Sequence, residues 1–175
     1  MQEINQNIVQ ESGLAARFIV IICFCLFGIL GTYSLVAQHG YLLLAVGALQ
    51  GLVFAFLAIR IMTAVVSLTN RDLQLQYGKS FAGRAVAYGM AYMLPFAILA
   101  VIADRFLHWP GVTLFTATGI MATGSAIGAE ISKAGKVKVM NYVLPSIIAL
   151  IISIAWMTVI IFINSISEIL LQIIK

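Results

Sequence analysis

The sequence predicts an all-α, polytopic transmembrane helical bundle with five spans, forming one integral membrane domain over residues 1–175. Hydrophobic residues make up 62% of the chain and charged residues 9%, whereas soluble domains carry about a quarter charged residues. The apolar runs approach the ~20 residues that a helix needs to cross the hydrocarbon layer. None of them alternates in the dyad pattern of an outer-membrane barrel.

Five uninterrupted apolar windows supply the predicted spans. The first follows a polar head. Its apolar core is about 20 residues long, against roughly 7 to 15 in a signal peptide, so we expect it to stay as an anchor. Charged residues mark the later boundaries, with Arg60 at the end of the second window, Asp104 after the third and Glu130 at the end of the fourth. The windows are 18–37, 41–60, 86–103, 112–130 and 143–163.

Two of the helices are expected to overrun the bilayer. After Arg60 the stretch "IMTAVVSLTN" keeps its apolar residues at helical spacing opposite a polar face, which predicts that the second helix continues into the interface. In "NSISEILLQIIK" the apolar residues recur at i, i+3, i+4, i+7 and i+8. This pattern predicts an interfacial helix over about 165–174, and a long, tilted fifth span would satisfy it equally.

The distribution of cations predicts the orientation. The formal net charge of +4 arises from cations concentrated in short links and at span ends, which is a topology signal and not a nucleic-acid footprint. Cations crowd the links after the second and fourth spans, so the positive-inside rule puts the N-terminus in the cytoplasm and the C-terminus outside. The inner-face basic residues are Arg71, Lys79, Arg84, Lys133, Lys136 and Lys138.

The motif Tyr-x-Leu-Pro occurs twice, as "YMLP" at 92–95 and "YVLP" at 142–145. Proline lacks an N–H and crowds the carbonyl four residues back, so it kinks a helix interior but is tolerated in the first turn. Pro95 lies about halfway along the third span and predicts a kink, whereas Pro145 lies near the start of the fifth. We interpret Tyr92, Pro95, Tyr142 and Pro145 as shaping the helices. The alternative is a bent helix pair that forms a shallow cytoplasm-facing cavity.

Small residues recur every four positions in two spans. Gly47 and Gly51 form a G-x-x-x-G in the second, and Gly124, Gly128 and Ser132 repeat the spacing in the fourth. Such stripes let another backbone approach closely, which predicts tight helix packing. The partner helix belongs either to this chain or to a second copy.

Polar side chains inside the spans have two interpretations. Gln50 lies in the middle of the second span, and Thr116 and Thr123 belong to a set of hydroxyls in the fourth. Hydroxyls can bond to carbonyls of their own helix, and Gln50 can form an interhelical hydrogen bond. Alternatively, the three residues line a polar, partly hydrated path.

The chemistry of an enzyme is missing from the sequence. No charged residue lies well inside a predicted span, where ionisable groups mark proton relays and ion sites. There is no G-x-S-x-G, H-E-x-x-H or phosphate-cradling glycine loop. Cys23 and Cys25 would point about 200° apart on a helix and cannot share a metal. We therefore expect no catalytic, cofactor or metal site, and no enzyme.

The chain resembles the Yip family, five-span membrane proteins named for interaction with Ypt/Rab GTPases, and more particularly its short bacterial members. The stretches "YGKSFAGRAVAYGMAYMLP" and "GIMATGSAIGAEISKAGKVKVMNYVLP" carry the resemblance, within roughly residues 50–165. It implies a cytoplasmic N-terminus and an outer C-terminus. The chain lacks the long N-terminal region and Asp-Leu-Tyr-Gly-Pro motif of eukaryotic members, so Rab binding is not carried over.

Two functional hypotheses follow. The first is a non-enzymatic integral membrane protein that acts through helix–helix and lipid contacts, as a scaffold or accessory subunit of a membrane complex. The alternative is a small-solute or ion permeation unit formed by oligomerisation. The expected partners are membrane lipid and either further copies or other membrane subunits, with no nucleic acid. The resemblance and the small size together suggest a multi-pass protein of the bacterial inner membrane.

Overall fold

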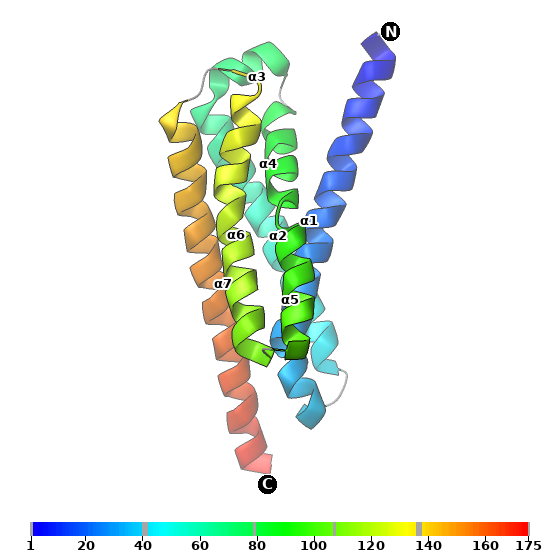
Figure 1. Cartoon of the computed structure of the whole chain (residues 1–175), viewed down its shortest axis with the longest axis vertical. Helices are drawn as coiled ribbons and strands as arrows, with labels where there is room; N and C mark the ends of the chain where they lie inside the picture. Colours follow the sequence, from blue (N-terminus) through cyan, green and yellow to red (C-terminus); the bar gives the residue numbers. More distant parts are fainter. Residues whose placement is uncertain (1, 40–41, 79, 107, 136–137, 175) are drawn as a thin grey trace.

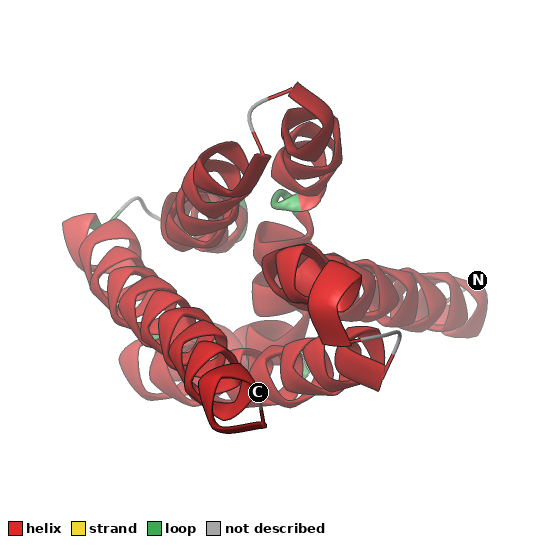
Figure 2. Ribbon diagram, turned by 90° about the horizontal axis from the view of Figure 1, so that it is seen from below, coloured by secondary structure: helices red, strands yellow, loops and turns green. Residues whose placement is uncertain are grey.

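A computed structural model of the whole chain describes the backbone of residues 2–39, 42–78, 80–106, 108–135 and 138–174. Side chains are described for 13–32, 44–78, 80–106, 112–135, 138–163 and 165–166. The described backbone is helical, with short turns and no strand (Figures 1 and 2). Its helices are α1 Gln2–His39, α2 Leu42–Thr69, α3 Arg71–Tyr77, α4 Phe81–Ala91, α5 Leu94–Phe106, α6 His108–Ser132 and α7 Val139–Ile174.

Five stretches of the described chain are long and apolar enough to cross a bilayer, with α4 and α5 together making one of them. The predicted all-α fold with five spans is therefore confirmed. The stretches reach beyond several of the predicted windows because the helices continue past the charged residues at the window boundaries, such as Arg60. They are Gly13–Thr32, Leu44–Thr69, Phe81–Phe106, Val112–Ser132 and Val139–Ile163.

The two termini lie at opposite ends of the bundle, and α3 lies at the same end as the N-terminus (Figure 1). The turn between α6 and α7 is at this end as well. We call it the basic end, because it carries Arg71, Arg84, Lys133 and Lys138. Lys79 and Lys136, predicted for the same face, lie outside the described residues. That the basic end faces the cytoplasm stays a prediction.

An aromatic cluster lies in the core of the bundle. The ring of Trp156 in α7 is fully buried and meets the rings of Phe54 in α2 and Phe24 in α1 edge to face, at centroid distances of 4.9 and 5.6 Å. Phe27 extends the cluster along α1, 6.5 Å from Phe24. Such pairs contribute about 0.5–1.5 kcal/mol each beyond their area burial. They join the first two helices, α1 and α2, to the last, α7.

The third span is broken where the proline argument predicts a kink. α4 ends at Ala91 and α5 begins at Leu94, with a turn over Tyr92 and Met93. The N–H groups of these two residues donate to the carbonyls three back, at Gly89 and Met90 (3.3 and 3.1 Å). Pro95 has no N–H for the carbonyl of Ala91, so the helix tightens and then restarts.

α7 runs without a break from Val139 to Ile174. It therefore differs from the separate interfacial helix that we expected over 165–174, and it matches the long fifth span that the same pattern allowed. No Gly or Pro follows Pro145, so nothing in the sequence ends the helix. Pro145 itself lies inside α7, near its start, and does not interrupt it. α2 is the other helix that we expected to extend past the bilayer, and it continues past Arg60 to Thr69.

Candidate functional site

The glycines of α2 pack against α1 of the same chain. A Cβ atom added at Gly47 would lie 2.5 Å from the carbonyl oxygen of Gly28, and one added at Gly51 would lie 2.6 Å from the carbonyl carbon of Phe24. Contacts this short leave no room for a methyl group. The stripe predicted from Gly47 and Gly51 is thus filled by a backbone from within the chain. Gly28, its counterpart, was missed by sequence reasoning, although Thr32 follows it at the small-residue spacing.

The glycines of α6 pack against α7. A Cβ at Gly124 would lie 2.7 Å from the backbone nitrogen of Ser146, and one at Gly128 would lie 2.6 Å from the ring of Tyr142. Tyr142 of the second Tyr-x-Leu-Pro motif therefore packs on the small-residue stripe. Ser132, the last member of the stripe, donates its hydroxyl hydrogen bond to the carbonyl of Gly128 in its own helix, at 2.8 Å.

The threonines of the candidate polar path are bonded within their own helix. The buried hydroxyl of Thr116 donates to the carbonyl of Val112 (2.8 Å), and that of Thr123 donates to the carbonyl of Ile120 (2.6 Å). α6, which carries them, packs against α4, α5 and α7, whereas α2, which carries Gln50, packs against α1, α4 and α7. The three residues predicted as a path therefore lie on two helices, α2 and α6, that share no extensive interface in the described part of the chain.

Gln50 lacks the interhelical hydrogen bond that we expected. Its amide nitrogen and oxygen are buried without a partner in the described part of the chain, and so is the indole nitrogen of Trp156. The two side chains belong to one region, since Phe54, one turn along α2 from Gln50, contacts the Trp156 ring. Leaving a buried polar group unpaired costs about 1–3 kcal/mol. Sequence reasoning missed Trp156; the available signal was a tryptophan in mid-span and away from the aromatic belts.

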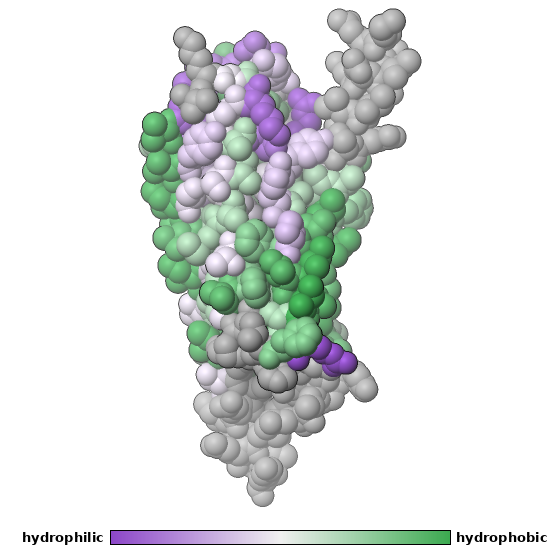
Figure 3. Space-filling model, in the orientation of Figure 1, coloured by the Kyte–Doolittle hydropathy of each residue, from purple (hydrophilic) through white to green (hydrophobic). Residues whose placement is uncertain are grey.

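A groove of about 530 Å³ lies at the break between α4 and α5. α4, α5 and the turn between them contribute Tyr88, Ala91, Tyr92, Leu94 and Pro95; the last turn of α6 contributes Glu130, and the residue that follows α6 is Lys133. Figure 3 shows hydrophilic atoms gathered toward the basic end of this face, over α6 and α4, with apolar atoms over α5 below. The broken helix therefore supplies the apolar wall of the groove, and α6 supplies its charges.

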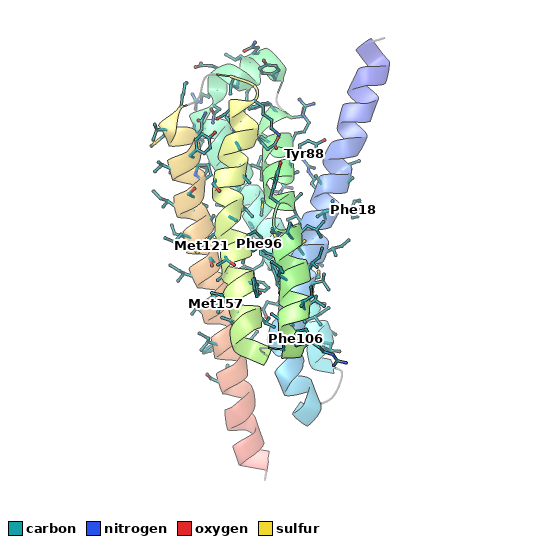
Figure 4. All side chains as sticks on the ribbon, in the orientation of Figure 1. Phe18, Tyr88, Phe96, Phe106, Met121 and Met157 are labelled. Atoms are coloured by element: carbon teal, nitrogen blue, oxygen red, sulfur yellow. The ribbon has the colours of Figure 1, made fainter. Side chains whose placement is uncertain are left out.

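The two charged residues of the groove form an ion pair. The ammonium of Lys133 donates to a carboxylate oxygen of Glu130 at 2.5 Å, with side-chain exposures of 65% and 14%. This hydrogen bond raises the pKa of Lys133 above its ordinary value. The lysine lies just beyond the membrane-length stretch that ends at Ser132, where the boundary of the hydrocarbon layer is expected. Figure 4 shows Tyr88 on α4 toward the basic end and Phe106 at the far end of α5.

The other predicted basic residues are spread over the basic end. Arg71 and Lys138 are exposed, and the guanidinium of Arg84 donates to the carbonyl of Tyr77 at 3.5 Å. Of the predicted basic set, the groove includes Lys133 alone among the described residues. The predicted shaping residues Tyr92 and Pro95 line the same groove. It differs from a cavity formed by a bent helix pair, because α7 is unbroken and contributes no described residue to its lining.

Comparison of the chain with protein-family models, curated proteins and solved structures found no match in any of the three. The described residues contain no group of three His, Cys, Asp or Glu side chains that could hold a metal ion. Within these residues, the arrangement offers a packed interior, two unpaired polar groups in the core and a lateral amphipathic groove.

Proposed function

We propose that this chain is a non-enzymatic integral membrane protein that acts through helix–helix and lipid contacts, as a scaffold or accessory subunit of a membrane complex. Its expected setting is the bacterial inner membrane, with the basic end in the cytoplasm. The Yip-like stretches and the distribution of cations support this setting. Other membrane subunits, or further copies of the chain, are its proposed partners.

The observation that carries the proposal is that the small residues pack, and the hydroxyl side chains bond, within the chain itself. α1 packs closely against the glycines of α2, and α7 packs closely against those of α6. The hydroxyls of Thr116 and Thr123 bond to carbonyls of their own helix. The glycines therefore hold neighbouring helices together, and the threonine hydroxyls are already bonded within α6. The surfaces left for interaction are the outer faces, such as that of α5, where Ile98 and Ile102 are exposed.

Proteoliposome flux and co-purification test the proposal together. The scaffold account expects no flux of ions or small solutes above that of empty vesicles. It also expects a membrane partner, or a second copy, recovered at fixed stoichiometry from mild detergent. Replacing Ile98 and Ile102 by Ala should weaken that recovery if α5 forms the contact, and Ile147→Ala with Ile151→Ala on α7 is the matched control. Robust flux through the wild-type protein would contradict the account.

A specific observation favours a second candidate, a permeation unit. The amide of Gln50 and the indole of Trp156 have no partner among the residues that the structure describes, and they are polar groups inside the bundle that internal water could satisfy. In that case Gln50→Leu should abolish flux, with Thr116→Val and Thr123→Val as companion changes. Flux that persists in all three variants would contradict a path through these residues.

A further inference from the structure

The charged end of the groove, at Glu130 and Lys133, lies at the expected depth of a lipid headgroup, and its apolar end, at the α4–α5 break, lies deeper along the third span. Lys133 follows directly on the span that ends at Ser132, and α4 enters the bilayer at Phe81 on the same end of the bundle. From the ion pair, the groove extends along Leu94 and Pro95, toward the hydrocarbon. A molecule that fills it would have a polar end beside Glu130 and Lys133 and an apolar end beside α5.

The ion pair leaves hydrogen-bonding capacity for both charges of a ligand. A lysine ammonium has three donors and a carboxylate has two oxygens, whereas the Glu130–Lys133 contact uses one donor and one oxygen. The largely covered carboxylate is fixed in place, and the exposed ammonium can turn toward a ligand. Tyr92, which is 55% exposed, adds an aromatic ring to the lining of the groove. Aromatic faces attract ammonium groups.

We propose that this groove binds the headgroup of a zwitterionic glycerophospholipid with a primary ammonium, as in phosphatidylethanolamine. The phosphate lies on Lys133, the ammonium lies on Glu130 beside Tyr92, and the start of an acyl chain lies against Leu94 and Pro95. The groove carries one positive and one negative side chain, so a headgroup with one charge of each sign is complementary. An anionic headgroup has no cation to offer Glu130. The volume of about 530 Å³ is within the range of small-molecule sites.

This site is independent of the scaffold function, since a permeation unit could carry it equally well. Native mass spectrometry of the purified full-length protein, titrated with phosphatidylethanolamine or phosphatidylglycerol of the same acyl chains, tests it. We expect the wild type to prefer the ethanolamine lipid. Glu130→Gln should weaken its binding about tenfold, the scale of one charge-assisted hydrogen bond, and leave phosphatidylglycerol unchanged or tighter. Lys133→Gln should weaken both lipids.

Lys138→Gln is the matched control, because it removes the same charge at the same end but lies outside the groove; neither affinity should change. A second variant, Ala91→Leu, keeps both charges and fills the groove, and should also lose the ethanolamine lipid. Soluble glycerophosphoethanolamine should not displace the lipid, since it lacks the acyl contacts. Equal binding of the two lipids, or equal losses in the Lys138 and Glu130 variants, would overturn the proposal.

Discussion

Individual residues decide how closely the helices approach. At Gly47 and Gly51 the absence of a side chain lets α2 touch the backbone of α1, so the contact depends on the lack of a Cβ atom. At Gln50, next to Gly51, the helix buries an amide that has no hydrogen-bond partner among the described residues. The same short stretch of α2 thus contains a stabilising feature and a costly one. Each can be tested by a single substitution.

Gly51→Ala should lower the free energy of unfolding by about 1–3 kcal/mol, because the new methyl group must push against the backbone of Phe24 and Cys25. Thermal or denaturant unfolding in detergent measures the change. Gly13→Ala is the control, since its Cβ would make an ordinary contact of 3.5 Å with the side chain of Arg84. Equal stability of the two variants would contradict the close α1–α2 contact.

Gln50→Leu should raise the free energy of unfolding by about 1–3 kcal/mol, because it removes two buried polar atoms that have no partner in the described part of the chain. Gln76→Leu, at an exposed position of α3, should change it by less than about 0.5 kcal/mol. The same unfolding measurement serves both. If Gln50→Leu destabilised the protein, the amide would have a partner such as internal water, which would favour the permeation hypothesis.

At the scale of elements, the break between α4 and α5 has the largest effect. It turns one span into two short helices and opens the groove beside α6. The sequence predicts the break because proline chemistry is local. It does not predict the groove, because that requires Glu130 and Lys133, about forty residues away, to pack beside Tyr92. The unpaired state of Gln50 was missed for the same reason, since it depends on which side chains neighbouring helices present.

Pro95→Ala should restore the missing hydrogen bond and straighten the third span. Spin labels at positions 80 and 106, both exposed, should then move apart. The separation should approach the roughly 39 Å that 26 residues span at 1.5 Å per residue. Pulsed electron resonance measures it. Pro145→Ala, in the unbroken α7, is the control and should leave this separation unchanged. A distance that does not lengthen in Pro95→Ala would show that proline does not cause the break.

At the scale of the molecule, hydropathy was enough to predict five membrane-length helices, because a bilayer demands long apolar segments whatever their neighbours. The sequence could not predict which glycine stripe packs against which helix. Gly47 and Gly51 identify a surface but not Gly28 as its counterpart. The continuity of α7 was left open by the pattern of 165–174, which fits a surface helix and a long span equally. The orientation across the membrane depends on the cations of the basic end.

Cysteine labelling in intact cells tests that orientation most directly. A cysteine at position 138, at the basic end, should be protected from a membrane-impermeant thiol reagent until the cells are opened, whereas one at position 106, at the other end, should react from outside. Cys23 and Cys25 lie within the first span and should stay unlabelled in the wild-type control. Labelling at 138 in intact cells, with protection at 106, would contradict the account.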